Sequence, residues 1–202
     1  MVQDLYFDSD KHIYYVKGEK VPSVSDLLKP IDLVALESIP PQYLAIASER
    51  GTRVHEACEF IDLYGYDEWL ESESDENIDI SGYVDAYVRF KEEIDYTPYN
   101  VEEAFLSPTM NVCGTIDRIC MVNGNRCIVD LKSGKMITLQ RAEAQLSFYK
   151  RLWEENNTDK PIEKLYILQL ANDSTYKFVE VKYNEKIVET LTWLYATKGE
   201  KI

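Results

Sequence analysis

The sequence predicts an α/β (α+β) fold in which helices flank a central mixed β-sheet. Helical hydrophobic spacing dominates the first half of the chain, whereas strand-like runs around an Asn-Gly turn dominate the second half. Apolar residues make up 45% of the 202 residues, which is enough for a packed core. The length fits a single domain at 1–202, with an N-terminal hairpin and helices at 1–50 and a core at 51–202.

The N-terminal segment predicts a hairpin followed by short helices. Leu5–Phe7 and Ile13–Val16 are β-prone runs on either side of a polar turn. Serine hydroxyls within residues 22–25 can cap a helix, and we expect Pro30 to end it because proline lacks a backbone N–H. A further separate helix is expected at residues 41–48.

Two longer helices complete the first half. Apolar residues recur at helical spacing from Thr52 to Tyr64, and Gly65 is a typical residue at a helix C-terminus. Residues 80–94 show the same spacing. The acidic run at 68–79 lies between these helices and is typical of a solvated loop.

The second half predicts the order β-β-β-α-β-(β)-α. A helix between the third and fourth predicted strands favours a sheet in which that helix forms the crossover. We expect strands at 101–106, 114–122, 126–131, 164–170 and 176–182, and helices at 138–155 and 185–196.

The composition limits the classes of function. A net charge of −14 argues against binding nucleic acid mainly through phosphate neutralisation, because such proteins normally carry a basic patch. A metal site, in contrast, needs carboxylates. No apolar stretch approaches the ~20 residues of a membrane helix, and the N-terminus lacks the features of a signal peptide. We therefore expect a cytoplasmic protein that has no membrane segment.

The four cysteines are expected to be buried free thiols. None belongs to a close C-x-x-C pair, which is the usual sign of a zinc site or an iron–sulfur cluster. Free cysteine behaves as a small hydrophobic residue. We therefore expect no iron–sulfur cluster, and the four residues are Cys58, Cys113, Cys120 and Cys127.

The pair Asn123-Gly124 lies between two β-prone runs and predicts a hairpin, because a type I′ turn requires positive φ at both central residues. Asp117 and Asp130 are equally distant from this turn. Their carboxylates would face each other with Cβ atoms about 4.5–5.5 Å apart, and Lys132 would point to the same face. If the turn instead begins one residue later, Asp117 faces Lys132 in an ordinary ion pair.

Facing carboxylates on adjacent strands repel each other unless a cation lies between them. A divalent ion bridging Asp117 and Asp130 would remove this repulsion. Hard oxygen ligands of this kind suit Mg²⁺ or Mn²⁺. The hairpin therefore predicts a metal site.

These residues resemble the core of the PD-(D/E)XK nuclease superfamily. Gly114–Asp117 resembles its G-x-x-D segment, and Ile128–Lys132 resembles its D-x-K strand. Gly51–His55 is similar to the G-T-x-x-H helix of the RecB-like and phage-exonuclease-like branch. Gln145–Tyr149 is similar to its Q-x-x-x-Y helix, and Val21–Ser25 to a P-S-V-T segment of phage members. The resemblance implies a restriction-endonuclease-like core and a metal-dependent nuclease.

The resemblance also implies roles for individual residues. Asp117, Asp130 and the backbone carbonyl of Leu131 would hold Mg²⁺ or Mn²⁺. His55 would be a further ligand, and an imidazole favours manganese. Lys132 would orient the attacking water and offset negative charge on the phosphate.

Two neighbouring residues, Glu102 and Glu103, are candidates for the glutamate that the family carries before its G-x-x-D segment. Alternation along a strand allows only one of them to face the metal, and the hydrophobic pattern does not decide between them. We favour Glu102 because its spacing to Gly114 is closer to that of related exonucleases.

Four polar residues are candidates for contacts with the substrate. Gln145 and Tyr149 share one helix face and could reach the substrate backbone or Lys132, although Tyr149 could equally be a packing residue. Arg141 and Lys135 could contact phosphate, or could be solvated surface cations.

We therefore expect a metal-dependent DNA exonuclease in phage-type recombination, repair or DNA processing. A structure-selective endonuclease on the same core is an alternative, as is an acidic DNA-mimicking or partner-binding protein on a nuclease scaffold. Single- or double-stranded DNA would be the substrate, and a recombination or replication protein a possible partner. Strand polarity and oligomeric state stay open.

Overall fold

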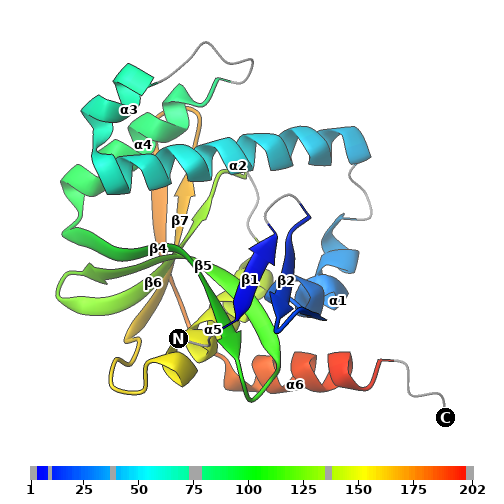
Figure 1. Cartoon of the computed structure of the whole chain (residues 1–202). Helices are drawn as coiled ribbons and strands as arrows, with labels where there is room; N and C mark the ends of the chain where they lie inside the picture. Colours follow the sequence, from blue (N-terminus) through cyan, green and yellow to red (C-terminus); the bar gives the residue numbers. More distant parts are fainter. Residues whose placement is uncertain (1–3, 9–10, 37–39, 73–78, 135–137, 199–202) are drawn as a thin grey trace.

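The computed structural model describes residues 4–8, 11–36, 40–72, 79–134 and 138–198. Two sheets and six named helices are described in these ranges, and the predicted mixed α/β class is confirmed. Figure 1 shows the small N-terminal sheet beside the central sheet, with helices on both faces of the central sheet. Within the described ranges, no helix combines the length and apolarity that crossing a bilayer requires.

The N-terminal sheet contains three antiparallel strands. β1 (Leu5–Asp8) pairs with β2 (Ile13–Val16), as the sequence predicts, and β2 also pairs with β3 (Glu19–Val21). The third strand was not predicted, because a three-residue strand with two charged residues carries no hydrophobic alternation. An isolated bridge between Ser23 and Cys113 connects this region to the central sheet.

Helices α1 (Val24–Leu36) and α2 (Pro41–Tyr64) are both longer than predicted. The expectation that Pro30 ends α1 is wrong: the helix continues through it, although proline removes one backbone hydrogen bond. The helices expected at 41–48 and 52–64 are one continuous helix, because a glycine weakens a helix without forbidding it. Gly65, with φ 107°, follows α2 as its C-terminal cap, as predicted.

The acidic run is only partly described. Its beginning is not a loop but belongs to α3 (Tyr66–Ser72), which is anchored by the buried Trp69. Acidic residues in the first turn of α3 favour the helix dipole. Residues 73–78 of the run lie outside the described residues. Helix α4 (Ser81–Glu93) follows and matches the helix predicted at 80–94.

The central sheet has the order β4-β5-β6-β7-β8. Only β6 and β7 are parallel among its pairs, and the other three pairs are antiparallel, so the sheet is mixed as predicted. Helix α5 forms the crossover between β6 and β7, and α6 follows β8. The bounds are β4 Tyr96–Ser107, β5 Val112–Val122, β6 Asn125–Lys132, α5 Leu139–Asn156, β7 Lys164–Leu170, β8 Tyr176–Val181 and α6 Glu185–Ala196.

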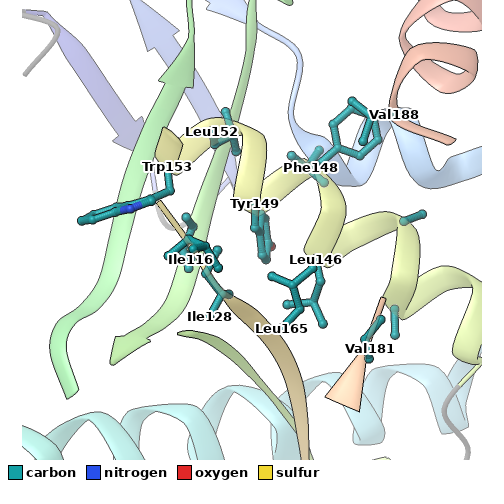
Figure 2. Close-up of a cluster of buried hydrophobic side chains, with 14 of the residues drawn as sticks. Ile116, Ile128, Leu146, Phe148, Tyr149, Leu152, Trp153, Leu165, Val181 and Val188 are labelled. Atoms are coloured by element: carbon teal, nitrogen blue, oxygen red, sulfur yellow. The ribbon is translucent and has the colours of Figure 1, made fainter. Parts of the chain in front are cut away.

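Two hydrophobic clusters cover the two faces of this sheet. On one face, α1, α5 and α6 pack against Ile116, Ile128 and Leu165. Figure 2 shows Phe148, Tyr149 and other α5 side chains within this cluster. On the opposite face, helices α2, α3 and α4 pack against inward-facing residues of β5 to β8. The sheet is therefore the middle layer, and its strand ends are the places where functional side chains can converge.

All four cysteines are buried and free. They lie in α2, β5 and β6, in the interior expected for small hydrophobic residues. Burial raises the pKa of Cys127 to about 11 and that of Cys113 to about 12. The prediction that these residues are buried thiols is confirmed.

Candidate metal centre

The turn between β5 and β6 is the predicted one. Asn123 and Gly124 have φ values of 48° and 76°, as a type I′ turn requires. Pairing runs from Val122 with Asn125 to Arg118 with Val129. The alternative register, with the turn one residue later, is wrong.

The β5–β6 pairing stops at Arg118 and Val129, although both strands continue. At this point the carboxylate of Asp117 replaces the backbone pairing, because its Oδ2 accepts a hydrogen bond of 2.8 Å from the backbone N–H of Leu131. Asp117 therefore lies where the two strands separate. The backbone oxygen of Leu131 faces His55 Nε2 there instead of a strand partner.

Strand β4 brings Glu102 to the same place. Its neighbours pair with β5, Val101 with Arg118 and Glu103 with Ile116, so that Glu102 lies opposite Asp117. Glu102 has a φ of 47°, in the left-handed region that non-glycine residues seldom adopt. Glu103, in contrast, accepts a hydrogen bond from a nearby asparagine on β4. The structure thus brings Glu102, and not Glu103, to Asp117.

His55 on α2 completes this cluster. Its Nδ1 lies 3.3 Å from Glu102 Oε1 and 3.7 Å from Asp117 Oδ2, and its Nε2 lies 3.1 Å from the backbone oxygen of Leu131. One ligand atom from each of His55, Glu102 and Asp117 lies within 4.8 Å of the other two. Three elements that are distant in the sequence therefore meet at one point.

The charges of this cluster favour a cation. Burial lowers the pKa of His55, but Asp117 and Glu102 raise it by more, so the net shift is upward. Both ring nitrogens face oxygen acceptors, and only the doubly protonated ring can donate to both. The oxygens around His55 therefore favour positive charge at this point.

Asp130 lies beside the cluster and is not one of its three members. Its carboxylate is fully buried, and neither oxygen has an aligned hydrogen-bond donor among the described residues. The ammonium of Lys132 nevertheless approaches Oδ2 to 2.6 Å, so the two side chains share one face as predicted. Burial raises the pKa of Asp130, the nearby Lys132 lowers it, and the net shift is upward.

These residues fit a divalent metal ion. Asp130 Oδ1 has no hydrogen-bond partner among the described residues, whereas buried polar atoms normally have one, and Oδ2 is contacted by the Lys132 ammonium. The neighbouring cluster combines two carboxylates with one imidazole. Oxygen ligands suit Mg²⁺ or Mn²⁺, and an imidazole shifts the preference toward Mn²⁺. The backbone oxygen of Leu131 is close enough to this group to add another donor.

A buried ion pair supports the cluster from the side of α2 and α4. Arg118, which is fully buried on β5, donates to Asp62 Oδ2 at 2.6 Å and to Glu102 Oε1 at 3.1 Å. Asp62 also accepts hydrogen bonds from Tyr87 at 2.5 Å and Lys91 at 2.8 Å. Arg118 thereby links Glu102 to the hydrophobic face beneath the site.

Gln145 and Tyr149 share one face of α5 at the pocket, as predicted. Gln145 Nε2 donates to the Tyr149 hydroxyl at 2.9 Å, and Arg141 donates to Gln145 Oε1 at 2.9 Å. Arg141 also contacts Asp32 of α1 at 2.5 Å, so it is held in a network rather than solvated. Burial raises the pKa of Tyr149 well above its usual value, which keeps the phenol protonated. Lys135 lies outside the described residues.

The three cluster residues, together with Lys132, Gln145 and Tyr149, line a pocket of about 260 Å³. Sequence reasoning assigned no site role to Phe7, His12 or Tyr14, because nothing in a short hairpin marks its inward face as functional, whereas Ser23, Val24 and Ser25 lie in the segment that resembles the family's P-S-V-T motif. A larger cavity of about 490 Å³, between α4 and β7–β8, contains none of the metal-cluster side chains. The smaller pocket is lined by Phe7, His12, Tyr14, Ser23, Val24, Ser25, His55, Glu102, Gly114, Thr115, Asp117, Lys132, Gln145 and Tyr149.

Solved structures give distant similarities. A protein from Eubacterium rectale with a provisional exonuclease assignment has a TM-score of 0.46 and 10% identity; the match covers 72% of this chain and spans 63% of that protein. The protein SSO0001 has a TM-score of 0.39 and 14% identity, with coverage of 86% and 83%. A comparison with curated proteins gives no match.

The family comparison is more informative. The model of the PD-(D/E)XK nuclease superfamily matches residues 56–201. The matched range begins one residue after His55 and includes Glu102, Asp117, Asp130 and Lys132. It covers most of the chain and the strands that form the candidate centre. The chain therefore belongs to the PD-(D/E)XK nuclease superfamily.

Proposed function

We propose that this protein is a Mg²⁺- or Mn²⁺-dependent deoxyribonuclease whose centre is the cluster at the end of the β5–β6 pairing. The observation that carries this proposal is the convergence of His55, Glu102 and Asp117 within 4.8 Å. Asp130 and the carbonyl of Leu131 are the further proposed ligands. A bound divalent metal would activate water near neutral pH and stabilise negative charge on the phosphate.

Lys132 is the proposed partner of the attacking water and the scissile phosphate. Its ammonium lies 2.6 Å from Asp130 Oδ2, which holds the cation at the wall of the pocket. A fixed cation at that position stabilises negative charge that develops on phosphate oxygens, without reorganising during the reaction. Removing Asp130 would therefore affect both the ligand set and the position of Lys132.

Gln145 and Tyr149 are proposed to contact the substrate backbone. The Tyr149 oxygen accepts the hydrogen bond from Gln145, so its own hydroxyl proton is available to donate. Because Tyr149 lines the pocket, this donor can reach a phosphate or sugar oxygen. A neutral phenol is suited to this contact, since a phenolate would repel phosphate.

We favour an exonuclease. The proposed centre lies in a pocket whose walls come from the N-terminal hairpin, α1, α2, the sheet and α5. A volume of about 260 Å³ suits one nucleotide unit at a strand end. Recombination or repair, with a partner protein that assists DNA binding, is the proposed setting for this acidic chain.

The test is a cleavage assay with linear single-stranded, linear double-stranded and closed circular DNA of one sequence. We expect cleavage of linear DNA in Mg²⁺ or Mn²⁺, none in chelator, and little cleavage of circles. Asp117→Ala and Lys132→Ala should lose at least ~100-fold in rate, the usual effect of removing one charge-stabilising group. Metal-independent cleavage, or full activity in both variants, would contradict the mechanism. Rapid cutting of circles would indicate the endonuclease.

Glu103→Gln provides a matched control for Glu102→Gln. The two residues are adjacent on β4 and undergo the same chemical change, but only Glu102 lies in the cluster. We expect Glu102→Gln to lose activity and Glu103→Gln to keep it. Equal losses in the two variants would refute the assignment of Glu102.

A further inference from the structure

One wall of the candidate nuclease pocket is made of aromatic rings from the N-terminal sheet. Phe7 on β1 stacks on Tyr14 of β2 with ring centroids 4.5 Å apart. His12 meets Phe7 edge to face at 5.1 Å, and its side chain is exposed. All three residues line the pocket that contains His55, Glu102 and Asp117. Tyr14 is only 2% exposed and supports Phe7, so Phe7 and His12 are the rings that a ligand can contact.

A hydrogen bond fixes this aromatic wall relative to the proposed metal ligands. The hydroxyl of Tyr14 lies 2.7 Å from the hydroxyl of Thr115 on β5. Thr115 precedes Asp117 by two residues, which corresponds to about 6.6 Å along a strand. The separation between Thr115 and Asp117 is similar to the distance between the phosphate and the base of one nucleotide. A phosphate at the acidic cluster would thus place a base beside the rings.

The charge of the pocket indicates what it can bind. Among the described residues that line it, only Lys132 has a permanently cationic side chain, and the whole chain has a net charge of −14. Binding through many phosphate contacts requires many cations. Stacking of bases on aromatic rings requires none and tolerates any base sequence.

We propose that the aromatic wall formed by Phe7, His12 and Tyr14 binds the base of the terminal nucleotide of a single DNA strand. This inference rests on the proposed nuclease function and specifies its substrate as an unpaired strand end. Rings in the wall contact the open face of the terminal base. The terminal pair of a duplex also has an open face, but it brings a second strand with its own phosphates. Among the described residues that line the pocket, Lys132 alone carries a permanent positive charge to balance the phosphates of a second strand.

The first test compares cleavage of a single strand whose terminal nucleotide carries a base with cleavage of the same strand ending in an abasic site. We expect the wild-type protein to prefer the base-bearing end by about 5- to 150-fold in kcat/KM, the range of base–aromatic stacking. Phe7→Leu keeps the apolar packing but removes the ring, and His12→Ala changes an exposed side chain. Both variants should reduce this ratio.

Tyr6→Leu is the matched control. Tyr6 is adjacent to Phe7 on the same strand, is 62% exposed and does not line the pocket. The ratio compares two substrates on one protein, so a general loss of active protein cancels. A wild-type ratio near one, wild-type ratios in both pocket variants, or an equal fall in Tyr6→Leu would overturn the proposal. Faster cleavage of a blunt duplex than of a single strand would also overturn it.

The second test does not require catalysis, so it separates this inference from the nuclease function. Oligonucleotides carrying fluorescent 2-aminopurine at the 5′ end, the middle or the 3′ end are titrated with protein in Ca²⁺, which takes oxygen ligands, in place of Mg²⁺ or Mn²⁺. We expect quenching of one terminal analogue by wild type and Tyr6→Leu, and weaker quenching by Phe7→Leu. Quenching without any nuclease activity would retain the binding site and reject the nuclease. Cleavage without terminal quenching would reject the binding site alone.

Discussion

Replacing Asp130 by asparagine should have opposite effects on stability in the absence and presence of metal. Asp130 is fully buried, and burial raises its pKa despite the nearby Lys132. A carboxyl whose pKa is higher in the folded state than in the unfolded state destabilises the fold at pH values above its unfolded pKa. Asparagine keeps the shape and removes that charge. At pH 7.5 in chelator, Asp130→Asn should therefore be at least as stable as the wild type.

The magnitudes follow from the size of the chain. A gain of about 1 kcal/mol corresponds to roughly 2–4 °C in Tm for a protein of this length. Metal at about 100 times its Kd stabilises the wild type by about 2.7 kcal/mol, which corresponds to roughly 5–11 °C. Asp130→Asn should show only a small part of this increase, because a proposed ligand has lost its charge.

The assay is scanning calorimetry of wild type, Asp130→Asn and Glu56→Gln, in chelator and in Mn²⁺. Glu56 is exposed on α2 next to His55 and controls for the loss of one negative charge near the site. We expect Glu56→Gln to behave as the wild type. The reasoning is refuted if Asp130→Asn lowers Tm by several degrees in chelator, or if it keeps the full metal-induced increase.

Three further predictions concern the scaffold. Asp62→Asn should lower the free energy of unfolding by about 3–5 kcal/mol in urea titration, because it removes the carboxylate 2.6 Å from the buried guanidinium of Arg118 and leaves Glu102, at 3.1 Å, as the remaining carboxylate partner; a loss below 1 kcal/mol would contradict this. Burial raises the pKa of Asp26, but hydrogen bonds with Lys29 and Ser23 lower it by more, so the net pKa is about 2. Ionised Asp26 should add about 1 kcal/mol to the free energy of unfolding through the cap of α1. This contribution should be present above the unfolded pKa of about 3.8 and be lost as the pH falls toward 2. Asp26→Asn should not show this loss of stability between about pH 4 and pH 2. Gly82→Ala should lose about 1–3 kcal/mol, since a Cβ would lie 2.0 Å from a backbone oxygen after β7; an unchanged urea midpoint would argue against this contact.

Much of the fold could be predicted because local signals agree with the tertiary structure. The turn at Asn123-Gly124 requires positive φ, and it fixes the β5–β6 register from the Val122–Asn125 pair to the Arg118–Val129 pair. Strand β7 and helix α6 have the predicted bounds, since their hydrophobic patterns end abruptly at polar residues. In these segments the residues that favour the element locally are also the residues that the fold buries.

Other features could not be predicted because tertiary contacts override local preference. Helix α1 continues through Pro30, where Leu27 and Leu28 are buried against the sheet. Spacing to Gly114 favoured Glu102 over Glu103, but the structural reason was not predicted: the strand is irregular, with a register shift after Pro98 and a positive φ at Glu102. Strict alternation along a strand predicts neither irregularity.

The support of the site was also beyond sequence reasoning. Arg118 pairs with Asp62, which lies 56 positions earlier in the chain, and each residue alone resembles an ordinary surface charge. The aromatic wall has the same origin, because Tyr14 meets Thr115 across 101 positions. Motifs predict which residues carry the chemistry, whereas the partners that position them depend on how distant segments pack.

The most direct test of the proposed centre is electron paramagnetic resonance of Mn²⁺ bound to the wild-type protein, with detection of nitrogen couplings. The account predicts one bound ion with a coupling to an imidazole nitrogen, loss of that coupling in His55→Ala, and much weaker binding in Asp117→Ala. Mn²⁺ that binds without a nitrogen coupling, or binds Asp117→Ala as tightly as the wild type, would contradict a metal site formed by His55, Glu102 and Asp117.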